Sequence, residues 1–116
     1  MFERGSIYLA QLYPSKGAEP GKLRPVLVLQ TDLLNNIDHS TIIISPLSTN
    51  LVDDTYPLRI RISRRDKLLK TSDLLCDQIR SIDKTRLLPE KLATLNEKEM
   101  LMVELQTQIL LDFNNS

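Results

Sequence analysis

Two polar positions lie at the ends of apolar segments, where a strand can hold a side chain at the rim of a site. Arg24 opens the segment RPVLVLQ, directly after a loop rich in proline and glycine. A guanidinium held in this way can bind two phosphate oxygens at once. The alternative is a charged gatekeeper that protects a strand edge from aggregation. Ser48 and Thr49 follow the apolar run TIIISPL, and their hydroxyls can either donate to a phosphate or cap a turn.

The usual catalytic sets are missing from the chain. His39 is the single histidine, so two histidines cannot share acid and base duty within one chain, and its setting in NNIDHS predicts a solvated turn. Cys76 is the single cysteine, which excludes an intramolecular disulfide and a zinc site built on cysteines. Its apolar neighbours predict a buried, inert thiol. Asp53 and Asp54 form a loop carboxylate pair, which we expect to be solvated rather than metal-bound.

Composition limits the class of protein. The chain has 116 residues, of which 41% are hydrophobic and 26% charged. This predicts one domain over residues 1–116, because two separate cores would each be too small. No apolar run approaches the ~18 residues of a membrane span, and the N-terminus lacks the apolar region of a secretory signal, so we expect a soluble, cytoplasmic protein. The net charge is zero, but residues 56–72 hold six basic residues and one acidic residue, which allows a polyanion to bind one face.

Strand patterns precede a single helix pattern. In PLRIRI, Leu58, Ile60 and Ile62 should face the core and Arg59 and Arg61 the solvent. Pro46 has no N–H, so strand pairing should stop or bulge there. Asn96 and Glu99 resemble a capping box, and Leu101, Leu105 and Ile109 recur at helical spacing. We predict strands over 6–12, 24–30, 41–47, 57–62 and 73–82 and an amphipathic helix over 97–111, hence an α+β, mostly-β fold with the helix packed on the sheet.

Three blocks of sequence follow one another at a distinctive spacing. The first contains Arg4-Gly5-Ser6-Ile7-Tyr8, a Pro/Gly loop with Glu19, and Arg24-Pro25-Val26-Leu27-Val28. The second is TIIISPLSTN and the third is LLCDQIRSIDKTRL. Together they resemble the MazF/PemK-type toxins of bacterial toxin–antitoxin pairs over nearly the whole chain. Two residues depart from the family pattern: Ser6 replaces an acidic residue, which should affect only a local turn, and Ser48 stands where many members carry a catalytic threonine, unless Thr49 takes that role.

The resemblance implies a fold, an activity and partners. The expected fold is a small SH3-like β-barrel of the CcdB/MazF kind with a C-terminal helix, assembled as a homodimer. The expected activity is that of a sequence-specific endoribonuclease that cuts single-stranded RNA, including mRNA, without metal or other cofactor. A cognate antitoxin is expected to block the dimer groove with a flexible acidic tail.

The expected activity suggests roles for individual residues. Arg24 would neutralise the scissile phosphate while the ribose 2′-hydroxyl attacks, and Ser48 would donate a further hydrogen bond. Glu19 would assist proton transfer or hold Arg24, with a glutamate of no special role as the alternative. The substrate-binding residues that we expect are Lys16, Lys22, Thr49, Asp77, Gln78 and Arg80. Sequence-blind attraction to RNA would come from Arg59, Arg61, Arg64 and Arg65.

Two other functions remain open from the sequence. One is a non-catalytic poison that binds gyrase, as the related CcdB does; CcdB ends in a tryptophan-containing tail, whereas this chain has no tryptophan. The other is a degenerate family member that only binds RNA or an antitoxin, which the serine at position 48 allows.

Overall fold

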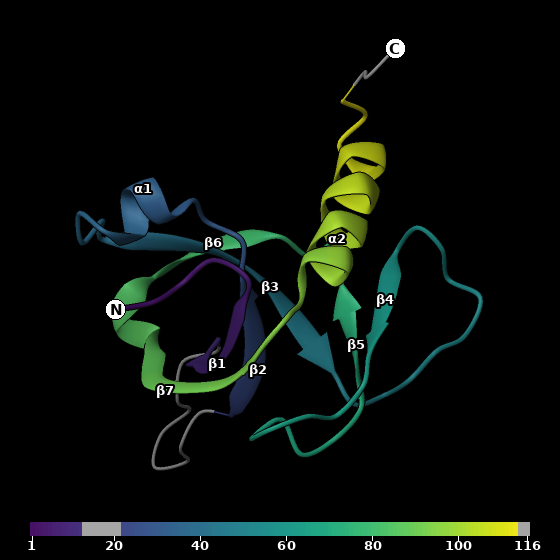
Figure 1. The fold of residues 1–116 in the computed structure, drawn as a ribbon, viewed down its shortest axis with the longest axis horizontal. Helices are drawn as coiled ribbons and strands as arrows, with labels where there is room; N and C mark the ends of the chain where they lie inside the picture. The colour runs from purple at the N-terminus through teal and green to yellow at the C-terminus, as the bar shows by residue number, and fades with distance from the viewer. Residues whose placement is uncertain (13–21, 114–116) are drawn as a thin grey trace.

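The computed structural model describes residues 1–12 and 22–113, which form a curled antiparallel sheet and a C-terminal helix (Figure 1). The strands are β1 (Ser6–Gln11), β2 (Leu23–Val28), β3 (Thr41–Ser48), β4 (Arg59–Ile62), β5 (Ser72–Leu75), β6 (Arg80–Asp83) and β7 (Leu87–Thr94). The helices are α1 (Asp32–Asn35) and α2 (Glu97–Leu110), and a 3-10 turn at Lys84–Arg86 joins β6 to β7. The predicted mostly-β fold with a C-terminal helix is therefore confirmed.

The long strand β3 organises the sheet. The strand order is β4-β5-β3-β2-β1-β7, and β6 also pairs with β3. β6 pairs with β3 as far as Ile44, and β5 takes over at Leu47. Pro46 lies in the gap between these two partners, so the predicted interruption at this proline is confirmed on that side of β3. On the other side, Pro46 still lies opposite Val26 of β2.

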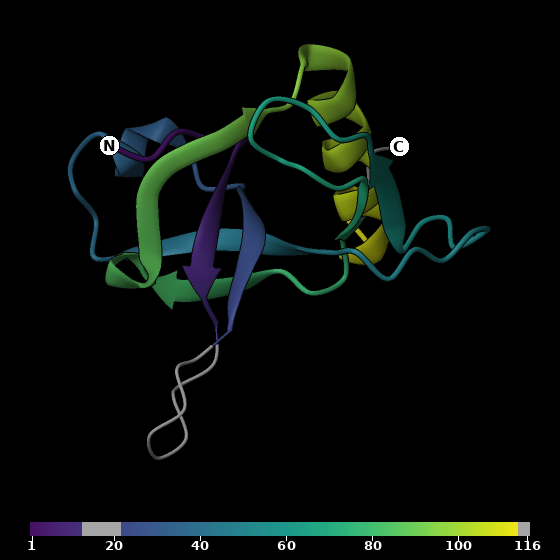
Figure 2. The same ribbon diagram turned by 90° about the horizontal axis from the view of Figure 1, so that it is seen from below.

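The sheet is strongly curled but open. β1 and β2 run steeply across β3 when the molecule is seen from below (Figure 2). Among the described strands, β4 and β7 end the strand order and do not pair with each other. A single backbone hydrogen bond of 2.9 Å, from the amide of Lys67 to the carbonyl of Leu92, brings the β4–β5 connection to β7. The expected barrel is therefore better described as a curled, incompletely closed sheet.

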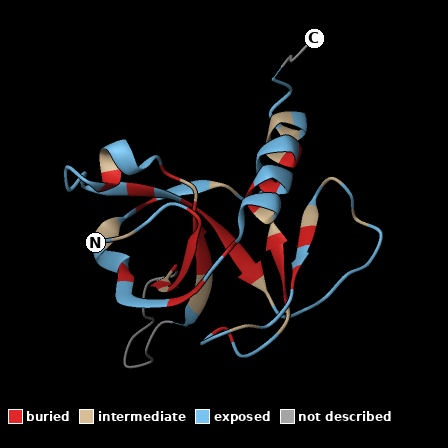
Figure 3. Ribbon diagram, in the orientation of Figure 1, coloured by how far each residue is buried: buried red, intermediate tan, exposed pale blue. Residues whose placement is uncertain are grey.

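The central strands are buried on both faces. In β2, Leu27 belongs to one hydrophobic cluster, whereas Val26 and Val28 belong to a second cluster on the other face. In β1, Ile7 and Tyr8 divide between the clusters in the same way, as the alternation of strand side chains requires. Figure 3 shows the buried residues concentrated in the middle of the sheet. This burial on two faces explains the nearly continuous apolar run after Arg24.

Helix α2 begins at the predicted capping box but packs through a different face. The Asn96 side chain accepts from the Glu99 amide at 2.8 Å, and the Glu99 carboxylate accepts from the Asn96 amide at 3.0 Å. Met100 and Val103 pack into the core. The stripe at Leu101, Leu105 and Ile109, from which the helix was predicted, is 50–55% exposed. Because α2 is apolar on both sides, helical spacing alone does not identify the packed face.

The predicted strand over residues 73–82 is wrong, because it comprises two strands, β5 and β6. The chain turns after Leu75, whose carbonyl accepts from the Gln78 amide at 3.1 Å. Strand β7 was not predicted, since its middle contains Pro89, Glu90 and Lys91 rather than an apolar alternation. Ile60 and Ile62 of β4 are buried as predicted, but Leu58 precedes the strand and is exposed. Ser6, expected to affect only a local turn, is the buried first residue of β1, and its hydroxyl lies 3.0 Å from that of Thr94 in β7.

Candidate active site

Arg24 lies near the start of β2, and its charged group has no ion-pair partner among the described residues. It faces Ala10 of β1 in the ladder and is half-buried. Its Nε is buried and makes no hydrogen bond to any of the described residues. A buried donor without a partner is costly, and such groups commonly mark a site where a ligand binds. The guanidinium is therefore held by a core strand and remains available to an anion.

A small pocket brings Arg24 together with three other predicted site residues. Its volume is about 120 Å³. The polar groups are two arginine guanidinia, one amide and one hydroxyl, from Arg24, Arg80, Gln78 and Ser48. The apolar lining consists of Leu12, Pro46, Leu47 and Leu75. No carboxylate from the described part of the chain lines this pocket, so its electrostatics favour a phosphate.

Ser48 reaches the pocket because it is the last residue of β3. Its hydroxyl oxygen accepts a hydrogen bond of 3.1 Å from the amide of Asn50. A serine hydroxyl still has its proton to donate after it accepts one bond. Thr49, the alternative hydroxyl, is exposed and lies outside the pocket lining.

Gln78 and Arg80 enter the pocket from a turn rather than from one continuous strand. Gln78 lies in the β5–β6 connection, and Arg80 begins β6. The carbonyl of Leu75, where this connection starts, accepts from the hydroxyl of Ser45 at 2.6 Å. Ser45 is 1% exposed and joins β3 to β5 where the two ladders meet. Sequence reasoning missed this role; the available signal was a small polar residue inside an apolar run, next to a proline.

The remaining predicted site residues divide into two groups. Lys22 and Asp77 are exposed and do not line the pocket. Lys16 and Glu19 lie outside the described residues. Four of the predicted site residues therefore line one pocket: Arg24, Ser48, Gln78 and Arg80. Three others lie outside its lining: Lys22, Thr49 and Asp77.

The basic face predicted on β4 is largely neutralised, which corrects the expectation of a free cationic strand. Arg59 and Arg61 both pair with Asp73, at 3.2 and 2.7 Å, and Arg61 also pairs with Asp53 at 2.8 Å. Burial by itself raises the pKa of the Asp73 carboxyl, but hydrogen bonds from Arg61, the Val52 amide and Arg59 outweigh it, so that the pKa is lowered. Sequence reasoning did not single out Asp73.

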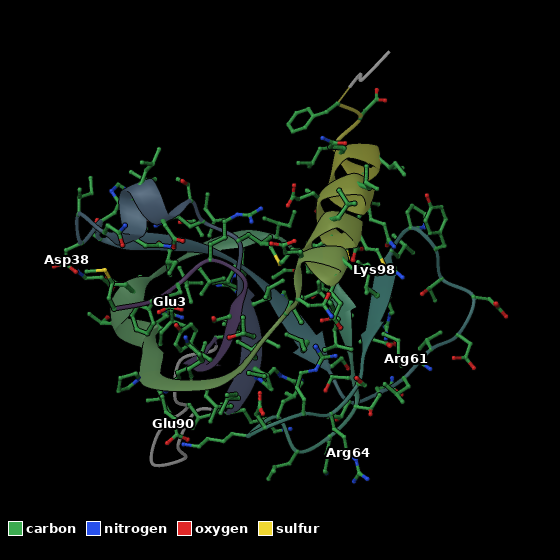
Figure 4. The ribbon with its side chains drawn as sticks, in the orientation of Figure 1. Glu3, Asp38, Arg61, Arg64, Glu90 and Lys98 are labelled. Atoms are coloured by element: carbon green, nitrogen blue, oxygen red, sulfur yellow. The ribbon has the colours of Figure 1, made fainter. Side chains whose placement is uncertain are left out.

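Arg65 is likewise engaged in an ion pair. It forms two hydrogen bonds, of 2.6 and 2.7 Å, with the carboxylate of Glu99 at the start of α2. These bonds lower the pKa of Glu99 more than burial raises it. Within the described ranges, only Arg64 of the four predicted attracting arginines has no ion-pair partner. Figure 4 shows Arg61 and Arg64 on the side of the molecule that carries β4 and β5, and Asp38 at the opposite end.

The single cysteine and histidine do not line this pocket. Cys76 is buried, and burial together with nearby Asp77 raises its pKa to about 11, so the thiol is inert as predicted. His39 is exposed in the turn after α1, also as predicted. It lines a larger pocket of about 460 Å³ beside Phe2 and Lys84. The amine of Lys84 already binds Asp38, and Gln30 and Asn35 in the same lining bond to each other, so fewer free polar groups face that space.

Comparison with known proteins shows which family the chain resembles. The family model for PemK-like, MazF-like toxins of type II toxin–antitoxin systems matches residues 3–111. The endoribonuclease MazF of Staphylococcus epidermidis is 38% identical over 116 residues, covering 99% of this chain and 95% of that protein. The endoribonuclease MazF of Staphylococcus saprophyticus is 39% identical over 101 residues, covering 86% and 82%.

Solved structures support the fold. The Mycobacterium tuberculosis toxin MazF-mt6 has a TM-score of 0.77 at 18% identity, covering 94% of this chain and 98% of its own. MazF in a MazE–MazF crystal structure from Deinococcus radiodurans has a TM-score of 0.77 at 23% identity, covering 97% and 96%. No helix of the described residues is both long and apolar enough to cross a membrane. With a family model spanning almost the whole chain and relatives near 38% identity, the chain belongs to the PemK-like, MazF-like toxins of type II toxin–antitoxin systems.

Proposed function

We propose that this protein is a toxin that cleaves single-stranded RNA in the pocket of Arg24 and Ser48, without a metal ion. The carrying observation is the Arg24 guanidinium, which a buried strand holds in a pocket with no carboxylate from the described residues. Its staphylococcal relatives are named endoribonucleases, which supports the same chemical class for this chain.

The reaction that suits these groups uses the nucleophile that RNA itself carries. The ribose 2′-oxygen bonds to phosphorus as its proton leaves, the bond from phosphorus to the 5′-oxygen breaks, and that oxygen takes up a proton. The products end in a 2′,3′-cyclic phosphate and a 5′-hydroxyl. The protein must align the 2′-oxygen with the leaving oxygen and stabilise the charge on the other phosphoryl oxygens.

The pocket residues divide these tasks. Arg24 binds the phosphoryl oxygens through its fork of N–H donors, and Ser48 adds a hydroxyl donor. Gln78 and Arg80 contact base edges and the neighbouring backbone. An arginine keeps its proton in proteins, so Arg24 stabilises charge rather than acting as a general base. Glu19 is our candidate for assisting proton transfer.

The partners follow from the same chemistry. Unpaired arginines that bind an RNA phosphate also attract the acidic tail of an antitoxin, and the Deinococcus radiodurans relative has been solved as a MazE–MazF complex. We propose a homodimer, supported by the exposed apolar side chains of Leu101, Leu105 and Ile109 on α2. We further propose that residues 1–116 act as one domain in the cytoplasm, where mRNA is available.

One assay tests the reaction. The purified protein is mixed, in excess EDTA, with a long single-stranded RNA or with the DNA of the same sequence. We expect discrete RNA fragments that end in 2′,3′-cyclic phosphate, intact DNA, and no cleavage by Arg24→Ala. Uncut RNA from a varied set of sequences would refute the enzyme. Gyrase trapping would then favour a CcdB-like poison, and RNA retention without cleavage a binding-only member.

A further inference from the structure

A buried carboxylate lies beside Ser48, and the proposed reaction does not use it. Asp73 faces Ser48 in the β3–β5 ladder, and its side chain is 1% exposed. A buried carboxylate is costly unless several donors satisfy its oxygens. Three donors reach Asp73: the Val52 amide at 2.9 Å, Arg59 Nη1 at 3.2 Å and Arg61 Nε at 2.7 Å.

These donors connect Asp73 to the backbone that follows Ser48. Arg59 Nη1 also donates to the carbonyl of Asn50 at 2.9 Å. The amide of Asn50 in turn donates to the Ser48 hydroxyl oxygen at 3.1 Å. Asp73 therefore holds residues 50–52 twice, directly at the Val52 amide and through Arg59 at the Asn50 carbonyl.

The contact with Asn50 limits the directions available to the Ser48 proton. A serine hydroxyl has one proton and two acceptor sites. The Asn50 amide occupies one acceptor site, and no acceptor among the described residues takes the proton. The proton is then free for a ligand in the pocket that Ser48 shares with Arg24. If residues 50–52 shifted, the hydroxyl would lose its fixed partner and rotate among its staggered positions.

We propose that Asp73 is a positioning residue, which acts through Arg59 and the backbone of residues 50–52 to orient the Ser48 hydroxyl toward the phosphate of bound RNA. The inference rests on the proposed function, since it gives a purpose to an orientation that matters only if Ser48 donates to substrate. Asp73 is not among the pocket-lining residues, so its effect on the reaction passes through Ser48.

The first test is a double-mutant cycle in which kcat and KM for RNA cleavage are measured for each variant. Asp73→Asn keeps the shape of the side chain and removes its charge, and we expect kcat to fall about 10-fold with KM within about twofold of wild type. In the Ser48→Ala background, the same change should have no further effect, because the group it positions is gone. An equal loss in both backgrounds, or no loss in either, would overturn the proposal.

Asp53→Asn is the matched control. Asp53 also pairs with Arg61, at 2.8 Å, but its side chain is 81% exposed, and among the described residues it makes no direct hydrogen bond to Arg59 or to the backbone of residues 50–52. The same exchange of carboxylate for amide at this position should leave kcat at the wild-type value. A comparable fall in kcat would show that general electrostatics around Arg61, rather than the link to Ser48, causes the effect.

A second variant covers the case in which Asp73→Asn does not fold. Arg59→Met removes the donor that joins Asp73 to the Asn50 carbonyl, and Arg59 is 24% exposed, so no fully buried group is replaced. We expect the same loss of kcat, which should likewise disappear in the Ser48→Ala background. A wild-type kcat for Arg59→Met would contradict the proposed route.

Amide hydrogen exchange separates this inference from the proposed function. In Asp73→Asn or Arg59→Met, the amides of Asn50 and Val52 should exchange about 10-fold faster, while core amides of β2 keep their protection. Unchanged exchange in residues 50–52 would overturn the positioning role whatever the enzyme does. Faster exchange in a protein whose wild type cuts no RNA would refute the proposed function and leave the positioning of Ser48 intact.

Discussion

Two pairs of arginines on this sheet differ in whether they form ion pairs. Arg24 and Arg80 line the small pocket without an ion-pair partner among the described residues. Arg59 and Arg61, on β4, pair with the buried carboxylate of Asp73. The two pairs share a residue type and a strand setting, and they differ in whether a neighbouring strand supplies an acid.

This difference decides what each arginine can do. A guanidinium already bound to a carboxylate must weaken that pair before it can bind a phosphate, whereas an unpaired one offers its full charge. The cluster of Arg59, Arg61 and Asp73 therefore holds the structure around Ser48 in place, whereas Arg24 and Arg80 can bind a phosphate directly. A pattern of arginines in a strand therefore indicates an anion-binding surface only once the positions of the neighbouring carboxylates are known.

The largest effect should come from Arg24→Ala. We expect cleavage of RNA to fall about 10³-fold, because one charged donor set at the phosphate is lost. Stability should be unchanged or slightly higher, since the change removes a buried Nε without a partner and leaves no core cavity. Single-turnover cleavage and thermal melting measure the two effects. Arg64→Ala is the control, because Arg64 lies outside the pocket and has no ion-pair partner in the described part of the chain. A large drop in Tm for Arg24→Ala would make Arg24 structural.

Asp73→Ala should lower stability in addition to the loss of kcat expected for Asp73→Asn. Removing the acid leaves two arginines and the Val52 amide without their acceptor, and we expect a loss of about 2 kcal/mol, less than for a fully buried pair because both arginines are partly exposed. Urea denaturation measures the free energy of unfolding. Asp53→Ala, on the exposed partner of Arg61, should change it by less than about 0.5 kcal/mol. Equal losses of unfolding free energy in the two variants would show that the buried acid, Asp73, contributes no more to stability than the exposed acid, Asp53.

The dependence of the unfolding free energy on acidic pH should also reflect the ion pairs of Asp73. The folded-state pKa values of Asp73 and Glu99 are lowered below ordinary carboxyl values of about 4. Their contribution is therefore present at neutral pH and is lost as the pH falls through the lowered folded values. Unfolding free energies measured between pH 7 and pH 2 should decline less steeply in Asp73→Asn than in wild type. Parallel curves would show that Asp73 gains nothing from its donors.

The smallest effect should be on salt dependence. Arg80→Gln removes a free charge at the pocket, and we expect the slope of log affinity for RNA against log salt to fall by about one. Arg61→Gln should leave that slope unchanged, because its charge is already balanced by Asp73 and Asp53. Titrations of RNA at several salt concentrations compare the two variants. Equal slope changes would mean that both arginines reach the RNA.

Much of the site was predictable from local pattern. A guanidinium at the start of an apolar strand and a hydroxyl at the end of another were recognisable from Arg24 and Ser48, and the structure places both in one pocket. The change of pairing partner along β3, from β6 to β5, was only partly predictable. Pro46 indicated where the pairing is interrupted, but the hydrogen bond from Ser45 to Leu75 of β5 was not predicted. The prediction of which face of α2 packs against the sheet was wrong, because the helix has apolar residues on two faces and the sequence does not show which face is buried.

The sequence by itself determined strands β1 to β4, the capped helix and the residue types able to bind a phosphate, because these depend on alternation, capping and side-chain chemistry within a few neighbouring residues. Only the tertiary structure decided which arginines lack a carboxylate partner among the residues that it describes. Asp73 lies 14 positions from Arg59 and 12 from Arg61, and these groups meet only once the register of β4 against β5 is set. Register depends on the burial of whole strand faces, so no short stretch of the chain contains it.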